Sequence, residues 1–175
     1  TASPIGDTLP LLLSLNAQIV ISSSTNDKIL YLNDFFIDYR KTKLNNSQFI
    51  KLIKIPLHRN NIFKAYKISK RIDDDISAVC ASFNLNIKNN IIKSVSIAYG
   101  GMAAIPKRAL LCETSLLNKE LSEKNINLAQ QSLEKDFNPI DDMRASSKYR
   151  MKVAKNLLIK CFQEIKNKKL IRINA

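Results

Sequence analysis

The order of the strand and helix patterns constrains the fold more than any other feature of this sequence. The strongest β-strand patterns come first, at residues 63–71, 76–87 and 91–99. The short polar segment at residues 88–90 favours an antiparallel hairpin between the last two strands. From Pro106 onward the pattern is helical. Strands followed by a run of helices are typical of α+β proteins, so we expect an antiparallel three-stranded sheet packed with C-terminal helices.

Three helices are expected after the strands, at residues 106–117, 122–137 and 146–169. In the last of these, apolar side chains recur at the spacing of one helix face. The members of this stripe are Met151, Ala154, Leu158, Cys161, Phe162 and Ile165. We expect the stripe to face the sheet, with Leu158 and Phe162 at its centre and the lysines turned largely toward water.

The first 57 residues carry weaker patterns. A short helix is predicted at residues 8–16, with Asp7 as its N-cap and Pro10 in its first turn. The other elements expected there are strands at residues 18–22, 28–32 and 48–55, the first two forming a hairpin, and a helical turn or loop at residues 33–39. The polar stretch at residues 58–61 is the best candidate for a boundary between two sections.

Composition excludes several classes of protein. With 175 residues, 45% of them hydrophobic and 25% charged, the chain is too apolar to be disordered throughout. Its longest apolar stretch, residues 9–13, is far shorter than the roughly 20 residues that span a bilayer, so we expect no membrane partner. Cys80, Cys112 and Cys161 are widely spaced, which predicts neither disulfides nor a zinc site and favours the cytoplasm.

The net charge of +13 raises the question of nucleic acid as a partner. The lysines are scattered rather than clustered, and aromatic residues make up only 7% of the chain, with no Trp. We therefore expect a solvated basic surface and no nucleic acid partner, and keep a basic nucleic-acid-binding module as an alternative.

A few local features could carry chemistry. The run Asp73-Asp74-Asp75 follows Lys70 and Arg71, and it is either a solvated loop paired with those cations or a charged loop beside a ligand. Gly100 and Gly101 are expected to form a structural turn, and the lone histidine, His58, to be a surface residue. No nucleophile motif, glycine-rich phosphate loop or metal-binding motif is present, so we predict no metal-ligating residue.

Five segments in order resemble one family. They are Thr1-Ala2-Ser3-Pro4-Ile5-Gly6-Asp7-Thr8-Leu9-Pro10, Phe35-Phe36-Ile37-Asp38-Tyr39-Arg40-Lys41-Thr42, Ala65-Tyr66-Lys67 with Arg71-Ile72-Asp73-Asp74-Asp75-Ile76-Ser77-Ala78-Val79, Tyr99-Gly100-Gly101-Met102-Ala103, and Asp142-Met143-Arg144-Ala145-Ser146-Ser147-Lys148-Tyr149-Arg150. Together they resemble the iron–sulfur/FAD small subunit of xanthine dehydrogenases. The upstream iron–sulfur domains and glycine-rich flavin loop of that family are missing from this sequence.

The resemblance implies the fold and the partners. Residues 1–58 would be the C-terminal portion of a PCMH-type FAD-binding domain, and residues 59–175 a domain like the C-terminal domain of CO dehydrogenase flavoproteins. The family binds FAD, and iron–sulfur clusters and a molybdenum cofactor belong to other parts of the parent complex. A molybdenum-cofactor-binding large subunit and the electron acceptor NAD are the implied partners.

The resemblance also implies the role. The segment would help pass electrons from iron–sulfur clusters through FAD to NAD during oxidation of hypoxanthine or xanthine, and would be inactive on its own. The implied cofactor-binding residues are Thr1, Asp7, Ile50, Lys67 and Asp74. No catalytic residue is implied, because proton transfer on the purine belongs to the molybdenum subunit in this family. Thr1 and Asp7 would face the ribityl and adenosine portions of FAD, Ile50 the isoalloxazine, and Lys67 would hydrogen-bond the flavin. The alternative is a noncatalytic remnant that acts as an interaction module.

Overall fold

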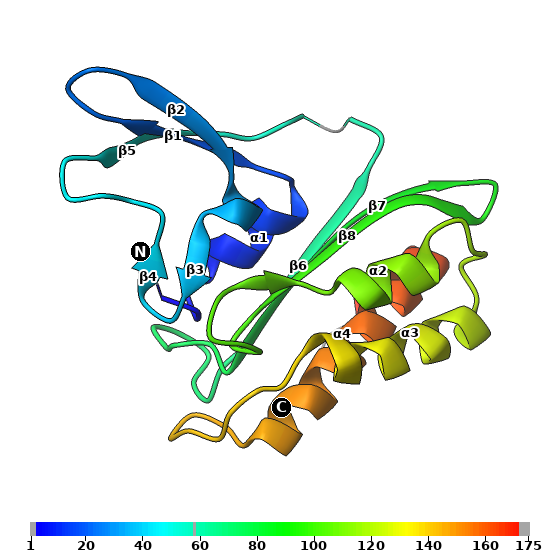
Figure 1. Cartoon of the computed structure of the whole chain (residues 1–175). Helices are drawn as coiled ribbons and strands as arrows, with labels where there is room; N and C mark the ends of the chain where they lie inside the picture. Colours follow the sequence, from blue (N-terminus) through cyan, green and yellow to red (C-terminus); the bar gives the residue numbers. More distant parts are fainter. Residues whose placement is uncertain (1–2, 58, 172–175) are drawn as a thin grey trace.

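The structure is a computed structural model that describes residues 3–57 and 59–171 (Figure 1). Thr1 and His58, both considered in the sequence analysis, lie outside the described residues. The described chain is an α+β protein, which confirms the predicted fold class. Two antiparallel sheets form its β component, together with a separate two-stranded pair.

The first section begins with a helix and a three-stranded sheet. Helix α1 spans Thr8–Ser14, and strands β1 (Gln18–Ser22), β2 (Asp27–Tyr31) and β5 (Phe49–Lys54) follow. The sheet order is β2-β1-β5 and all pairs are antiparallel, so the predicted hairpin is confirmed. The predicted helical turn or loop at residues 33–39 contains parts of two short elements, the 3-10 helix η1 (Leu32–Asp34) and the strand β3 (Phe36–Asp38). A further short strand, β4, spans Lys41–Thr42.

The second sheet contains the three long strands that the sequence predicts. These are β6 (Ile62–Ile68), β7 (Val79–Lys88) and β8 (Ile91–Gly100), in that order and antiparallel. A fourth strand, the two-residue β9 (Lys107–Arg108), pairs with the end of β8. The expected three-stranded sheet therefore has four strands, because residues that the sequence analysis placed in a helix add to its edge.

Three helices cover one face of this sheet (Figure 1). Helix α2 spans Leu110–Leu116, α3 spans Glu123–Asp136 and α4 spans Ser147–Asn167. The side chains of Ser122 and Ser146 accept hydrogen bonds from Asn125 N and Tyr149 N, which satisfies backbone donors at the start of α3 and α4.

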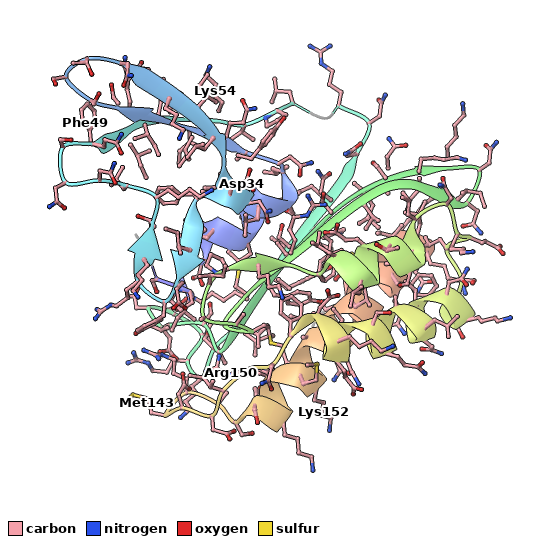
Figure 2. All side chains as sticks on the ribbon, in the orientation of Figure 1. Asp34, Phe49, Lys54, Met143, Arg150 and Lys152 are labelled. Carbon is pink, nitrogen blue, oxygen red and sulfur yellow. The ribbon has the colours of Figure 1, made fainter. Side chains whose placement is uncertain are left out.

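The stripe on α4 is confirmed as a packing surface. Leu158 and Phe162 are 3% exposed, and both belong to the large core beneath the helices. Lys152, by contrast, is exposed and extends away from the ribbon (Figure 2). No helix in the described parts of the chain is both long and apolar enough to cross a membrane.

The two faces of strand β8 belong to two different cores. Ile97 and Tyr99 pack under the C-terminal helices, whereas Ala98 packs with Leu9 and Leu13 of α1. Successive side chains of a strand point to opposite faces, so one strand can serve both cores. Helix α1 thus covers the face of the sheet that the other helices leave open. This packing places the turn before α1 against β6 and β7.

Candidate functional site

Three side chains from separate segments meet at the start of α1. Asp7 precedes the helix, Lys67 lies in β6, and Ser77 lies just before β7. Lys67 Nζ is 2.8 Å from Asp7 Oδ2, and the Ser77 hydroxyl donates to Asp7 Oδ1 at 2.5 Å. The contact between α1 and the second sheet therefore carries a partly exposed ion pair.

The ion pair has a further backbone partner. Lys67 Nζ donates to the carbonyl oxygen of Asp75 at 2.6 Å. The hydrogen bond to Asp7 raises the pKa of Lys67, so the ammonium keeps its charge at neutral pH. The side chains of Lys67 and Asp7 are 39% and 41% exposed, which leaves both accessible to a ligand.

The acidic loop, residues 73–75, is held largely by hydrogen bonds from nearby backbone amides to the Asp75 carboxylate. Asp75 Oδ2 accepts from Arg71 N, and Oδ1 accepts from Ile76 N, both at 2.9 Å. The Arg71 amide, followed by the Ile76 amide, lowers the pKa of the Asp75 carboxyl against the opposing effect of burial. Arg71 Nη2 also lies 3.7 Å from Asp75 Oδ1, so local pairing to Arg71 occurs, whereas Lys70 bonds elsewhere.

The structure brings together two of the five predicted cofactor residues. Asp7 and Lys67, 60 positions apart, form the ion pair. Asp7 occupies the N-cap position of α1, as predicted, but its side chain makes no cap hydrogen bond, and its two oxygens instead accept from Ser77 and Lys67. Ile50 is 40% exposed in β5, in the other sheet.

Asp74 lies at the tip of the acidic loop. Its side chain is exposed and its backbone has a φ of 48°, a left-handed conformation that Asp adopts more readily than most residues. Its carbonyl accepts from Arg71 Nη2 at 3.3 Å. Its role toward a cofactor, like those of Ile50 and Thr1, stays a prediction.

A hollow of about 230 Å³ lies beside the ion pair. Its lining residues are Asp7, Thr8, Leu11, Ala65, Tyr66, Lys67 and Cys80. The space is too small for a whole dinucleotide. Its wall is mostly apolar, with one cationic donor, Lys67, and one anionic acceptor, Asp7, among the lining residues.

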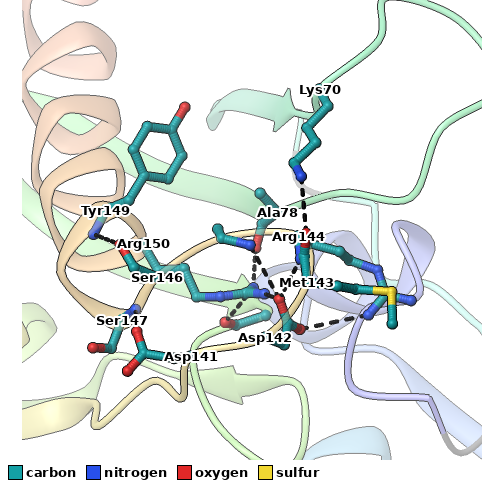
Figure 3. Close-up of polar contacts among 12 residues, drawn as sticks. Lys70, Ala78, Asp141, Asp142, Met143, Arg144, Ser146, Ser147, Tyr149 and Arg150 are labelled. Atoms are coloured by element: carbon teal, nitrogen blue, oxygen red, sulfur yellow. Dashed lines mark hydrogen bonds and ion pairs between the residues drawn. The ribbon is translucent and has the colours of Figure 1, made fainter.

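A second polar cluster centres on Arg150, which is 2% exposed (Figure 3). Its Nη1 donates to the carbonyl oxygens of Ala78 and, at 3.0 Å, Gly101, and its Nη2 donates to Asp142 Oδ1 at 2.6 Å. Lys70 Nζ donates to Met143 O at 2.8 Å, which links this cluster to the acidic loop. Arg150 thus joins the segments before β7, after β8 and before α4.

A cavity of about 460 Å³ opens next to Arg150. The residues that line it are Pro4, Ile5, Tyr39, Gly101, Ala103, Ala104, Ile140, Asp142, Arg144 and Arg150. Gly101 forms part of its wall with a φ of +80°, and Gly101 N donates to Pro4 O at 3.0 Å. The two-glycine turn therefore is structural, as expected, and it also borders a cavity.

Sequence reasoning missed Ser77 and Arg150. Ser77 stands inside the quoted motif Asp73 to Val79, but nothing in its local pattern distinguishes a buried serine from an exposed one. The Asp142–Arg150 spacing carried a detectable signal, because two opposite charges flank a predicted helix start. The hydrogen bonds from Arg150 to Ala78 and Gly101 depend on the tertiary fold, so the sequence pattern could not predict them.

The three cysteines are buried and unpaired with one another, as expected. Burial raises the pKa of Cys80 and of Cys161 to about 12, and it also raises the pKa of Cys112. These thiols therefore are packing groups and are protonated at neutral pH.

Comparison with known families gives the chain its class. Residues 1–58 match the FAD binding domain in molybdopterin dehydrogenase, and residues 64–165 match the CO dehydrogenase flavoprotein C-terminal domain. Fold and matches together define a flavin-binding segment of the molybdenum hydroxylase class. The chain belongs to the CO dehydrogenase flavoprotein C-terminal domain family, whose match covers more than half of it.

Individual relatives agree with this assignment. The chain is similar to the glyceraldehyde dehydrogenase medium chain of Sulfolobus acidocaldarius, with 29% identity over 94% of this chain and 58% of the relative. It is 34% identical to the xanthine dehydrogenase of Emericella nidulans over 79% of this chain and 10% of that protein. The fold resembles carbon monoxide dehydrogenase from Hydrogenophaga pseudoflava, with a TM-score of 0.85 and 18% identity, covering 90% of this chain and 55% of that chain. This chain therefore spans only part of the relatives that it matches.

Proposed function

We propose that this chain forms one wall of the FAD pocket in a xanthine dehydrogenase. In that role it helps pass electrons from iron–sulfur clusters through FAD to NAD while hypoxanthine or xanthine is oxidised. The observation that carries the proposal is the Asp7–Lys67 pair, which stands half-exposed where the segment matched to the FAD binding domain meets the second sheet. The relative named xanthine dehydrogenase supports the substrate class.

Lys67 and Asp7 have complementary roles in this proposal. The Lys67 ammonium donates to Asp7 and Asp75 O, so one of its three N–H groups remains for a flavin oxygen or nitrogen. Bound FAD supplies the group that exchanges electrons between carriers and NAD. The positive charge of Lys67 favours the electron-rich form of the ring, and Asp7 offsets part of that charge.

The remaining predicted residues would complete the wall. Ile50 would cover the isoalloxazine with an aliphatic side chain, Thr1 would contact the ribityl or adenosine portion, and Asp74 would contribute negative charge from the loop. None of these residues is proposed to transfer a proton to or from the purine. That chemistry is assigned to a molybdenum-cofactor-binding large subunit.

We assign NAD to the cavity beside Arg150. Tyr39 presents an exposed ring at its edge, and Arg144, which lies 3.5 Å from Asp142 Oδ2, would supply a cation for a phosphate. The Arg40 guanidinium lies 5.9 Å from the centre of the Tyr39 ring and adds positive charge nearby. Met143, which accepts from Lys70 Nζ, stands between Asp142 and Arg144 of the cavity lining, so an acceptor bound there would lie near the acidic loop.

The test uses the product of the complete gene, expressed together with a molybdenum-cofactor-binding subunit. The purified complex is expected to show flavin absorbance, to bleach with xanthine in the absence of oxygen, and to recover its absorbance on addition of NAD. A flavin-containing complex that xanthine does not reduce would contradict the substrate assignment. A flavin-free protein that binds DNA or RNA with steep salt dependence would instead support the nucleic-acid alternative.

A further inference from the structure

Ser77 is a buried polar residue at the edge of the proposed flavin wall. Its side chain is fully buried, and its hydroxyl donates to Asp7 Oδ1 at 2.5 Å. Buried hydroxyl groups nearly always have a hydrogen-bond partner, and here that partner is a carboxylate that reaches the surface. The contact therefore connects the interior of the fold to the ion pair.

The Asp7 carboxylate is held at both of its oxygen atoms. Ser77 engages Oδ1 and Lys67 engages Oδ2, so rotation of the carboxylate would break at least one contact. Helix α1 contributes no cap hydrogen bond from its own backbone to this side chain. Ser77 is thus the contact that fixes the carboxylate from the interior, while Lys67 approaches from the solvent side.

The orientation of Asp7 controls the orientation of Lys67. The ammonium already donates to Asp75 O at 2.6 Å and to Asp7 at 2.8 Å. Two fixed acceptors leave one N–H group of the lysine, and its direction is set by the positions of the other two. A change in Asp7 would therefore redirect the donor that faces a ligand.

We propose that Ser77 is a positioning residue of the flavin site, which holds Asp7 against Lys67 and so sets the charge and the free N–H group presented to FAD. This inference rests on the proposed function for its ligand. The claim that Ser77 fixes the Asp7–Lys67 pair depends on the contacts alone and not on the ligand. Ser77 gives the Asp7 carboxylate a hydrogen bond that the backbone at the start of α1 does not give.

The chain offers a matched control in Ser82. This serine is also fully buried, lies on β7, and forms a hydroxyl–hydroxyl hydrogen bond of 2.6 Å with Ser14 of α1. Ser77→Ala and Ser82→Ala each remove one buried hydroxyl between the α1 segment and the β7 segment. Ser77 contacts the ion pair and Ser82 contacts Ser14 instead, so a purely structural effect of losing a buried hydroxyl would appear in both variants.

The first measurement needs no cofactor. The pKa of the Lys67 side chain is followed by NMR in protein carrying isotope-labelled lysine, with the Lys67 signal assigned by Lys67→Met. Ser77→Ala is expected to lower this pKa toward the ordinary value of lysine, because Asp7 is no longer held beside the ammonium. Ser82→Ala is expected to leave it unchanged. An unchanged Lys67 pKa in Ser77→Ala, or an equal shift in both variants, would overturn the inference.

The second measurement links the contact to the flavin. In the product of the complete gene, Ser77→Ala is expected to weaken FAD binding by about threefold to tenfold, and to make the flavin easier to reduce. Ser82→Ala is expected to change neither property. A shifted Lys67 pKa with unchanged FAD affinity and potential would overturn the role at the flavin. If Asp7→Asn and Lys67→Met also leave FAD unaffected, the flavin wall itself is misplaced and the proposed function fails with it.

Discussion

Lys67 and Asp74 carry opposite charges and are both proposed to act on the flavin. Lys67→Met is expected to make the bound flavin harder to reduce, because the cation that stabilises electron-rich flavin is removed. Asp74→Asn is expected to make reduction easier and to change reactivity toward NAD. Flavin reduction potentials of both variants, with FAD content measured first, check this pair. Shifts of the same sign would place the two residues outside the redox site.

Gly101 is required by its surroundings. Its φ of +80° is rarely adopted by residues with a side chain, and an added Cβ would lie 2.4 Å from Ala78 O and 2.9 Å from Arg150 Nη1. Gly101→Ala is expected to cost about 1–3 kcal/mol of unfolding free energy, measured by urea denaturation. Gly100→Ala is the control, since its nearest contact would be Pro10 Cγ at 3.1 Å. Equal losses in the two variants would contradict the account of the turn.

At the scale of elements, α4 depends on a few buried apolar side chains. Phe162 is 3% exposed in the core between the second sheet and the C-terminal helices. Phe162→Ala is expected to destabilise the protein by about 3–5 kcal/mol, seen as a lower melting temperature. Asn156→Ala, an exposed position on the same helix, should change little. A parent-like melting temperature for Phe162→Ala would show that α4 packs differently.

The end of α4 is also fixed by a buried carboxylate. The Glu164 side chain is 1% exposed and lies within hydrogen-bonding or ion-pair distance of Lys160, Lys64 and Tyr66. Burial works to raise the pKa of Glu164, but hydrogen bonds from Lys160, the Ile171 amide, Tyr66 and Lys64 lower it to about 2. The carboxyl is therefore a stronger acid in the folded protein than in the unfolded chain.

This lowered pKa predicts an acid-sensitive contribution to stability. A carboxyl with a depressed folded-state pKa stabilises the fold above its unfolded value, near 4.5, and loses that contribution as the pH falls toward 2. The contribution is about 3 kcal/mol, because the pKa falls from 4.5 to about 2 on folding. Glu164→Gln should therefore flatten the loss of unfolding free energy between pH 5 and pH 2, as measured by urea denaturation. An unchanged slope would contradict the buried ion pair.

The helices and strands also show which parts of the fold can be predicted from sequence patterns. Strands β6, β7 and β8 and helices α3 and α4 were predictable, because their apolar periodicity reflects burial on one or two faces. Strand β9 was not predictable, because two residues are too few to show an apolar periodicity and they pair only with the end of β8. Within α4, the buried Arg150 and Glu164 interrupt the apolar stripe, and their partners come from distant segments.

At the scale of the whole molecule, the candidate site depends on packing between two sections. The resemblance named Asp7 and Lys67, but the sequence contains no sign that they form an ion pair across 60 positions. That contact exists because α1 covers the face of β7 and β8 opposite the C-terminal helices. The division at residues 58–59 stays a prediction, and the site lies where the two predicted parts meet.

The most direct test of the account is an equilibrium titration of FAD into the product of the complete gene, followed by flavin fluorescence. The wild-type protein is expected to bind one FAD, Asp7→Asn and Lys67→Met to bind it at least several-fold more weakly, and Ser82→Ala to match the wild type. Melting temperatures of all variants show whether weaker binding reflects unfolding. Saturable binding that is equally tight in Asp7→Asn, Lys67→Met and wild type would contradict the assignment of this ion pair to the flavin site.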